Sequence, residues 1–526
     1  MESTGFAHWL VVLVETFALL FVLLLVVVIL VVMVVWVLDR NQTHNSVLRN
    51  YPVIGHFRYW FLHLGEFFRQ YLYSSDREEL PFNRAQRMWV YRAAKNSENT
   101  NSFGSTRDLR GEGVPFFVNA AFPSLGDHHV EPKPVRIGPY SREPYDHASF
   151  FNISAMSFGA LSPNAVRALN AGAKKGGFAH DTGEGGVSPY HRENGGDIIW
   201  EIGSGYFGCR HSDGSFNPDK FAEVAANDQI KMIEIKLSQG AKPGHGGVLP
   251  GAKVTSEIAA IRGVEEGKDC LSPASHSAFS TPIEMMRFIG ELRRLSQGKP
   301  VGFKLCLGHA WEFLAICKAM LETKIYPDFI VVDGKEGGTG AAPLEFMDHL
   351  GMPMREGLVF VHNALVGIGA RNRIRIGAAG KIVTAFDIAR AMALGADWCN
   401  SARGFMFSLG CIQSLSCHTD RCPTGVATQD PTRSRALVVP DKSERVHNFH
   451  RSTIHALAEL TAAAGLDHPS DFHPVHFWRR VNVREATTFA EIYPSVETGE
   501  LVSGARDEGL RKAWSMASVD SFRVAM

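Results

Sequence analysis

Eight short apolar runs, separated by amphipathic stretches, constrain the fold of this chain more than any other feature. Each run has the length and the branched or aromatic content of a single buried strand. We interpret the runs as strands at Phe151–Met156, Gly177–Asp181, Ile198–Ile202, Met232–Lys236, Val301–Leu307, Phe329–Asp333, Ile374–Gly377 and Asp397–Ser401. Helical periodicity between them predicts helices that include Ser162–Lys175, Pro282–Leu295, His309–Leu321 and Thr384–Leu394. Strand–helix units repeated in this way predict an α/β fold, a (β/α)8 barrel of the TIM type.

Two of the predicted helices have a clear start signal. Ser162-Pro163 and Thr281-Pro282 each place an N-cap residue before a proline at the first helical position. We assign the barrel to residues 148–432 and expect a small, helical C-terminal extension at 433–526, with a helix near Ser443–Ala464.

The N-terminus is an apolar segment outside this pattern. Residues 9–38 are almost wholly Val, Leu, Ile, Phe and Met, which is more than the roughly twenty residues that span a bilayer. The segment lacks the basic start and small-residue cleavage site of a signal peptide. Arg40, Arg49 and Arg58 follow it and no Lys or Arg precedes it, so we expect a single-pass helix in the inner (cytoplasmic) membrane with the barrel facing the cytoplasm.

Residues 39–147 are interpreted as a linker and a segment that covers the barrel. Within them, residues 51–73 mix aromatic with basic side chains. That mixture suits a helix in the headgroup layer of a membrane or, equally, a helix packed on the barrel exterior.

Polar and glycine-rich segments follow the predicted strands. They include Ser157–Gly159, Thr182–Gly186, Lys236–Gly244, Asp333–Gly340, Gly377–Gly380 and Ala402–Gly404. The loops after the strands of such a barrel all meet at its carboxyl-terminal rim, where active sites lie. Glycines after the seventh and eighth strands let backbone N–H groups approach a phosphate, so a phosphate-bearing cofactor is expected there.

Lys236 and Lys304 lie on predicted strands among apolar neighbours. Either is a candidate for a lysine that stabilises charge on a flavin, and either is also a candidate for a structural ion pair inside the barrel. The letters of Gly203–Gly208 match a dinucleotide motif, but no helix can follow them, so electrons from a nicotinamide are expected to arrive through a partner protein.

Three of the eight cysteines, Cys411, Cys417 and Cys422, occupy one short segment. Thiolates gathered in this way are typical of an iron–sulfur or metal site. Three unrelated buried thiols are the alternative, and a zinc site completed by His418 is a weaker one, because paired C-x2-C spacings are missing.

Composition excludes one class of partner. Basic and acidic residues number 54 each, so no surplus of positive charge indicates nucleic acid.

Several of these motifs resemble the FMN domain of glutamate synthase. They are SFGALS at 157–162, TGEGG at 182–186, QGAKPG at 239–244, GGTGA at 337–341 and the segment 410–430. The resemblance implies a barrel that binds FMN and a [3Fe-4S] cluster, with Cys411, Cys417 and Cys422 as the cluster ligands. It implies the reduction of 2-iminoglutarate, formed from 2-oxoglutarate and ammonia, to L-glutamate.

Site residues follow from the resemblance and from the rim loops together. The catalytic candidates are Lys304, Glu184, Lys236 and Gln239. The candidates for binding FMN are Met156, Ser157, Thr182, Lys304, Gly337, Gly338, Thr339, Gly377, Gly380, Arg403 and Gly404.

Family members of full length carry a glutaminase domain and a β-helix domain that are not visible in this sequence. We therefore expect a stand-alone, membrane-anchored synthase domain that uses free ammonia or another amine and receives electrons from a donor protein or a quinone. Two alternatives are a membrane-linked flavin dehydrogenase that oxidises an amino or hydroxy acid and reduces quinone, and a non-catalytic electron carrier.

Overall fold

The structure is a computed structural model that describes residues 3–97, 100–124 and 134–524. It divides into two compact units, residues 1–84 and 85–526. The described residues of the first unit form α1 (Ser3–Asn41), α2 (Ser46–Asn50), α3 (Ile54–Phe68) and the π-helical turn η1 (Arg69–Tyr73). Within the part of the chain that the structure describes, Ala7–Asn41 is the one helix long and apolar enough to cross a membrane, and its most apolar stretch of eighteen residues has no buried residue.

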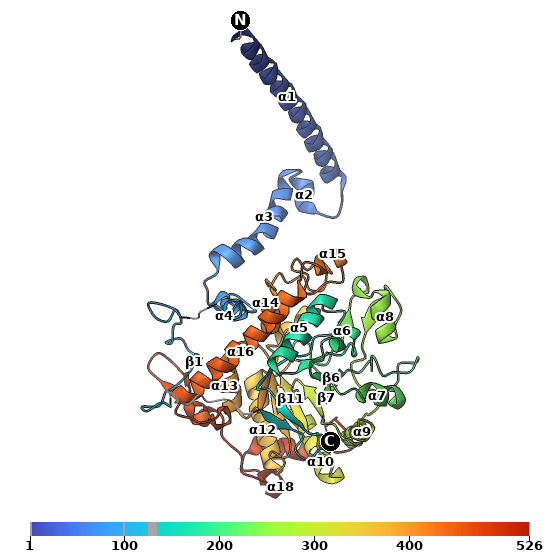
Figure 1. Ribbon diagram of the computed structural model, residues 1–526, viewed down its shortest axis with the longest axis vertical. Coiled ribbons are helices and arrows are strands. Elements are labelled where there is room, and N and C mark those ends of the chain that lie inside the picture. Colours follow the sequence, from blue (N-terminus) through green and yellow to red (C-terminus); the bar gives the residue numbers. More distant parts are fainter. Residues whose placement is uncertain (1–2, 98–99, 125–133, 525–526) are drawn as a thin grey trace. The chain divides into compact units, whose positions relative to one another are not determined.

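The second unit is built around a closed barrel of eight parallel strands (Figure 1). The strands follow the chain in the order β4 (Phe151–Ile153), β5 (His180–Asp181), β6 (Ile198–Ile202), β7 (Ile230–Lys236), β10 (Val301–Leu305), β11 (Phe329–Asp333), β12 (Arg375–Ala379) and β13 (Trp398–Ser401). β13 pairs with β4 and closes the barrel. The predicted fold class is confirmed, with all eight strands in their predicted places along the chain.

The predicted strand ends were wrong in several places. β4 stops at Ile153, three residues before Met156, and β10 stops at Leu305. Gly177 does not begin a strand: it has a φ of 64° and caps the C-terminus of the preceding helix. Only glycine adopts that left-handed conformation without strain, which makes it the usual residue for a helix end. The predicted strand Ile374–Gly377 corresponds to β12, which begins one residue later and ends two residues later than predicted.

Helices cover the barrel, and both predicted start signals are confirmed. Ser162 caps α5 (Pro163–Gly176) by accepting from the N–H of Ala165, and Thr281 with Glu284 forms a capping box at α9 (Pro282–Leu295). The other helices of the barrel are α6 (Pro189–Arg192), α7 (Pro218–Ala225), α10 (Ala310–Thr323), α12 (Met354–Gly367), α13 (Ala385–Ala393) and α14 (Arg403–Leu409).

Additional short elements interrupt the strand–helix pattern in the loops after β7 and β11 and after the cysteine segment. After β7 the chain forms β8 (Val248–Leu249), the 3-10 turn η2 (Gly251–Lys253), α8 (Ser256–Arg262) and β9 (Cys270–Leu271). After β11 it forms α11 (Leu344–His349), and after the cysteine segment it forms α15 (Pro431–Ser434).

The segment predicted as a linker has more structure than expected. It contains α4 (Arg84–Ala94), β1 (Pro115–Phe117), β2 (Val135–Ile137) and β3 (Tyr145–Ala148). β1 pairs with β14 (Phe477–Arg480), which pairs with β15 (Ala486–Thr488), so the two ends of the second unit share one small sheet. Strands of three or four residues are too short to carry a periodic signal, which is why the sequence did not predict these strands.

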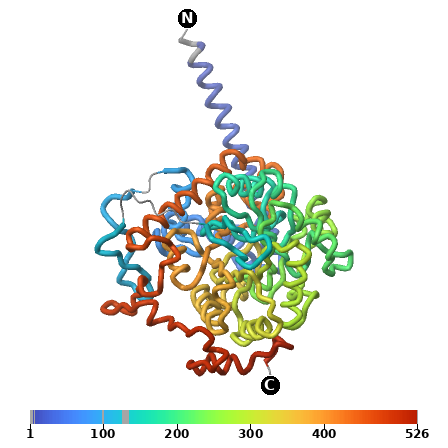
Figure 2. The backbone as a smooth tube through the Cα atoms, turned by 60° about the horizontal axis from the view of Figure 1, so that its bottom comes forward, coloured from blue at the N-terminus to red at the C-terminus, as the bar shows by residue number. Residues whose placement is uncertain are grey.

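The C-terminal extension runs along the outside of the second unit (red in Figure 2). Its long helix α16 (Val439–Ala463) begins four residues before the predicted start and packs against α5. The short elements η3 (Pro469–Asp471), η4 (Pro474–His476), α17 (Phe489–Ile492), α18 (Glu500–Ser503) and α19 (Glu508–Met516) follow it. The extension is therefore helical, as predicted, apart from its two strands.

Candidate active site

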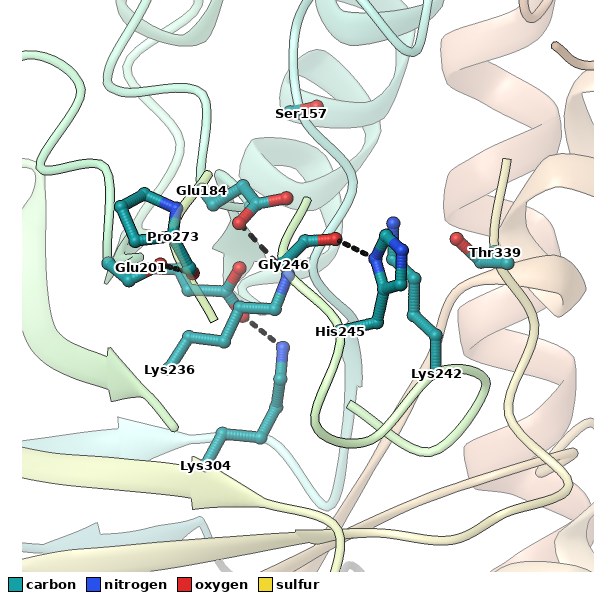
Figure 3. Close-up of polar contacts among 12 residues, drawn as sticks. Ser157, Glu184, Glu201, Lys236, Lys242, His245, Gly246, Pro273, Lys304 and Thr339 are labelled. Atoms are coloured by element: carbon teal, nitrogen blue, oxygen red, sulfur yellow. Dashed lines mark hydrogen bonds and ion pairs between the residues drawn. The ribbon is translucent and has the colours of Figure 1, made fainter. Parts of the chain in front are cut away.

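Polar side chains gather at the carboxyl-terminal end of the barrel (Figure 3). Lys236 is the last residue of β7, and Glu184 lies in the loop after β5. Lys236 Nζ lies 3.2 Å from Glu184 Oε2. Two of the predicted catalytic residues thus form an ion pair at the mouth of the barrel.

Glu184 is held in its charged form. Burial raises the pKa of its carboxyl, but Lys236, Lys242 and Arg262 outweigh burial, so the pKa of Glu184 is lowered overall. Burial also lowers the pKa of Lys242 to about 8. The mouth of the barrel therefore carries three basic groups around one carboxylate.

The loop after β7 lies across this end of the barrel. Gly240 donates its N–H to Asp333 Oδ2 at 2.9 Å, and Lys242 Nζ donates to the Ala341 carbonyl at 3.0 Å. A Cβ on Gly240 would lie only 1.6 Å from the Gly334 carbonyl oxygen, so the loop needs glycine there. Gln239 begins this turn, its carbonyl accepting from the N–H of Lys242. The contacts join the loop after β7 to the glycine-rich loop after β11.

Two residues that the sequence analysis missed support the same region. Arg262, buried at the end of α8, donates Nη2 to Ser157 Oγ at 3.2 Å and to the Phe158 carbonyl at 3.0 Å. His276 Nε2 lies 2.9 Å from the Lys236 carbonyl oxygen, and burial lowers the pKa of His276 to about 4. Neither residue lies in a glycine-rich motif, so nothing in the sequence singled them out.

Thr182 and Met156 lie in the loops after β5 and β4, at the carboxyl-terminal end of the barrel. Thr182 Oγ1 donates to the Gly183 carbonyl at 3.0 Å and accepts from the N–H of Glu201 at 3.1 Å. Met156 is buried in the loop after β4. Ser157 follows Met156 in the chain, so three predicted FMN-binding residues lie in these two loops.

Lys304 lies deeper, inside the barrel. It forms ion pairs with Glu201 and, at 3.5 Å, with Glu234. Lys304 is 3% exposed, and the two glutamates are 1% and 0% exposed. An oxygen of Asp181 and oxygens of these glutamates all lie within 4.8 Å of one another. The structural ion pair weighed in the sequence analysis is therefore present, and the role of Lys304 toward a flavin stays a prediction.

This interior cluster of Asp181, Glu201, Glu234 and Lys304 places three carboxyl groups around one ammonium group. Burial lowers the pKa of Lys304, but Glu201 and Glu234 outweigh burial and raise it well above its usual value. Burial and neighbouring carboxylates raise the pKa of Asp181 to about 7 and that of Glu234 well above its ordinary value. The cluster therefore holds protons that isolated carboxyl groups would release at neutral pH.

One signal in the sequence pointed to these carboxylates. Glu201 is the single polar residue of an otherwise apolar strand, and Glu234, its direct neighbour across the β6–β7 pair, lies between Ile233 and Ile235. An acidic residue in such a run needs a buried partner of opposite charge.

Arg403 connects two other predicted sites. At the start of α14 its Nη2 donates to the Thr339 carbonyl, and its Nη1 lies 3.6 Å from Cys417 Sγ. Gly337, Gly338 and Thr339 belong to the loop after β11, and Gly380 follows β12. A guanidinium beside the glycine-rich loop after β11 fits a phosphate-bearing cofactor.

Two of the predicted glycines have a packing role. A Cβ on Gly377 would lie 2.6 Å from the Trp398 ring, and one on Gly404 would lie 3.2 Å from the Phe449 ring. Both positions let a large side chain pack closely against the backbone.

The three cysteines share one loop after α14. All are free thiols; Cys411 and Cys422 are buried, and Cys417 is half-buried. Lys253 Nζ, which is itself buried, donates to the carbonyls of Ala160, Cys417 and Ala427 at 2.7, 3.3 and 3.1 Å. The lysine thus ties the cysteine loop to the loop after β4.

The spacing of the thiols bears on which group they would hold. Across the residues that the structure describes, the three Sγ atoms do not all lie within 4.8 Å of one another. Thiolates on one zinc ion, at Zn–S distances of about 2.3 Å, would lie about 4 Å apart. His418, the suggested fourth zinc ligand, is exposed. This spacing does not match three thiolates on one zinc ion, and the iron–sulfur cluster stays a prediction.

Comparison with known proteins identifies the family. Residues 129–467 match the family described as a conserved region in glutamate synthase. The chain is 42% identical over 481 residues to the glutamate synthase large subunit-like protein YerD of Bacillus subtilis, covering 84% of this chain and 91% of that protein.

More distant relatives cover less of the chain. The archaeal glutamate synthase [NADPH] of Methanocaldococcus jannaschii is 37% identical over 316 residues, which are 60% of this chain and 59% of that protein. A solved structure of mandelate oxidase matches with a TM-score of 0.39 and 13% identity, covering 76% of this chain and 98% of that one. The family match and the YerD alignment each extend over more than half of the sequence, and the chain belongs to the glutamate synthase family.

Proposed function

We propose that this chain is an FMN- and iron–sulfur-dependent oxidoreductase that forms L-glutamate by reducing 2-iminoglutarate, made from 2-oxoglutarate and ammonia. The main support is the ring of basic side chains around Glu184 at the mouth of the barrel, beside loops that suit a phosphate-bearing cofactor. The relatives named glutamate synthase [NADPH] support the same reaction.

Met156, Ser157 and Thr182 would hold FMN on one side, and Gly338, Thr339, Gly380 and Arg403 would hold it on the phosphate side. Bound there, FMN supplies the hydride for the reduction. Cys411, Cys417 and Cys422 would hold the [3Fe-4S] cluster. Arg403 contacts both Thr339 and Cys417, so the two cofactor sites share one guanidinium.

The residues of the rim supply binding and proton chemistry. Lys236, Lys242 and Arg262 carry the positive charge that a dicarboxylate substrate needs. Glu184 stays ionised and orients the Lys236 ammonium through their 3.2 Å ion pair. Lys236 then holds a proton at Nζ, at the place where a substrate nitrogen or carbonyl oxygen would gain charge.

We also propose that α1 anchors the protein in the cytoplasmic membrane and that a donor protein or a quinone exchanges electrons with it. The exposed apolar side chains of α1 support the anchor. The same helix favours a second candidate function, in which the barrel oxidises an amino or hydroxy acid and passes electrons to quinone in the membrane.

The two functions are separated by one experiment. The purified protein, with its flavin reduced anaerobically, is mixed with 2-oxoglutarate plus ammonia, with either compound alone, or with a soluble quinone. Glutamate synthesis predicts fast reoxidation only with the pair, and one equivalent of glutamate per flavin. Reoxidation by quinone alone, without glutamate, would favour the dehydrogenase.

Variants on β7 test the site itself. Lys236→Ala should slow the glutamate half-reaction by on the order of a hundredfold, because preorganised charge at the reacting atoms is lost. Lys231→Ala, near the other end of the same strand, is the matched control and should react normally. A flavin-free preparation that is otherwise folded would contradict the whole proposal.

A further inference from the structure

The region after α1 presents an unusual amount of apolar surface. Across α3 and η1 the large side chains are exposed, with Phe57 at 55%, Trp60 at 55% and Phe61 at 59%. The other exposed members are Ile54, Tyr59, Leu62, Phe67, Phe68, Tyr71, Leu72 and Tyr73. Of these, Phe57, Trp60, Phe61 and Phe68 recur at helical spacing along one side of α3, and we call these four residues the aromatic face. Monomeric soluble proteins rarely expose a continuous surface of this kind to water.

The start of α3 is fixed at the end of α1 by buried polar contacts. Asp39, in the last turn of α1, is 5% exposed. Its carboxylate accepts from the N–H of Val53 at 2.8 Å and from Nε2 of His56 at 2.9 Å. Asn45 Nδ2 donates to Tyr59 Oη at 2.7 Å and adds a second link. The chain between the helices therefore does not let α3 move far from the end of α1.

These contacts set the depth of α3 relative to any bilayer that α1 spans. The apolar stretch of α1 ends at Leu38, so Asp39 lies where the chain leaves the hydrocarbon. The first turn of α3, tied to Asp39, then lies at the headgroup layer. Aromatic side chains are enriched at that layer, because their rings are amphipathic.

The charges of this region also favour a position in the headgroup layer. From residue 39 to residue 73 the chain has four arginines, Arg40, Arg49, Arg58 and Arg69, against two carboxylates, Asp39 and Glu66. Two of the arginines lie on α3 and η1, among the aromatic residues. Arginine beside exposed aromatic rings suits anionic headgroups, to which it can donate several hydrogen bonds at once.

We propose that α3 and η1 lie in the headgroup layer of the membrane, with the aromatic face toward the acyl chains and the arginines on anionic lipid phosphates. This inference rests on the proposed membrane anchor but not on the proposed reaction. It makes the region after α1 a second membrane contact rather than a free linker.

Depth-resolved fluorescence quenching tests the proposal on the full chain. The protein is placed in vesicles of phosphatidylcholine and phosphatidylglycerol that carry bromine on the upper acyl carbons. The emission of Trp60 is obtained as the difference between the wild type and Trp60→Phe. We expect bromine to reduce that emission by about twofold or more, because the ring lies beside the upper acyl chains.

Two further tryptophans serve as matched controls. Trp36, in α1, should be quenched if α1 spans the bilayer, and it is measured with Trp36→Phe. Trp200, in the barrel core at 0% exposure, should not be quenched, and it is measured with Trp200→Phe.

The outcomes for Trp36 and Trp60 distinguish the membrane anchor from the second membrane contact. Quenching of both Trp36 and Trp60 supports the proposal. Quenching of Trp36 without Trp60 overturns it and indicates that the aromatic face packs on protein. No quenching of Trp36 refutes the membrane anchor and this inference with it, while glutamate formation, measured separately, is unaffected.

Discussion

Lys304 is the residue whose expected role changes most once its neighbours in the structure are known. A lysine on a strand of a flavin barrel suggests a group that faces the cofactor, yet its ammonium lies among three buried carboxyl groups. In this setting its first effect is to neutralise charge inside the barrel, because an unpaired buried carboxylate is very unfavourable. Any effect on the flavin comes in addition to that one.

We expect Lys304→Ala to lower the free energy of unfolding by about 3–5 kcal/mol, because it leaves the buried Glu201 carboxylate without a counter-charge. Thermal unfolding measures this loss. Lys268→Ala, which breaks an exposed ion pair with Glu265, is the control and should cost less than about 1 kcal/mol. Turnover per folded molecule is measured beside stability: a loss of about a hundredfold supports a role toward the flavin, whereas normal turnover leaves only the structural role.

The pH dependence of stability tests the protonation of Glu234. Its pKa is raised in the folded state, chiefly by burial, so the folded state holds a proton that the unfolded state releases above its own pKa of about 4.5. Glu234 therefore makes the protein less stable as pH rises above that value, by up to about 1.4 kcal/mol per pH unit. Glu234→Gln mimics the protonated form and should become progressively more stable than the wild type between about pH 5 and pH 8.

Glu266→Gln is the control for that measurement, since Glu266 lies exposed at the surface. It should show no pH-dependent difference from the wild type. A constant difference between Glu234→Gln and the wild type across the pH range would mean that Glu234 is ionised when folded.

At the scale of elements, the cysteine loop depends on a lysine that lies far from it in the sequence. Lys253 is 1% exposed and donates to one carbonyl in the loop after β4 and to two in the segment 417–427. Charged hydrogen bonds to buried carbonyls are among the stronger ones, so their loss should release the loop without opening the barrel.

We expect Lys253→Met to speed amide hydrogen exchange in residues 411–428 by at least about tenfold while the strands of the barrel stay protected. Iron content should fall in the same variant, and flavin content should not. Lys299→Met is the matched control, because Lys299 also binds two carbonyls, those of Ala225 and Asn227, and lies away from the cysteines. Equal exchange at 411–428 in both variants would remove Lys253 from this role.

How well each helix or strand could be predicted depended on the residues at its ends. Strands such as Phe329–Asp333 were predicted with correct ends, because branched and aromatic residues fill them and an acidic residue ends them. Gly177 was misplaced, because a glycine between a helix and a strand suits either a cap or a strand start. The pairing of β1 with β14 joins residues that are more than three hundred positions apart, and nothing in either short strand indicates the partner.

For the whole molecule, the rim could be predicted, but the interior of the barrel could not. Glu184, Lys236 and Gln239 lie in long motifs at strand ends, and barrel geometry brings strand ends together. The partners of Lys304 come from three other strands, so finding them requires knowing which side chains point inward. Arg262 and Lys253 lie in the excursion after β7, whose path is set by tertiary packing rather than by a local pattern.

The division into two units gives a prediction for the whole chain. The second unit contains the complete barrel, the candidate site and the C-terminal extension, so it has a hydrophobic core of its own. Deleting residues 1–73, up to the end of η1, should therefore give a protein that is soluble without detergent and retains flavin. Deleting only residues 1–41 leaves α3 and its aromatic face in place, and this shorter deletion should still bind vesicles that contain anionic lipid. Vesicle sedimentation and the flavin spectrum of the two proteins provide the measurement. If neither deletion keeps flavin, the barrel needs the first unit to fold, and the division into independent units is wrong.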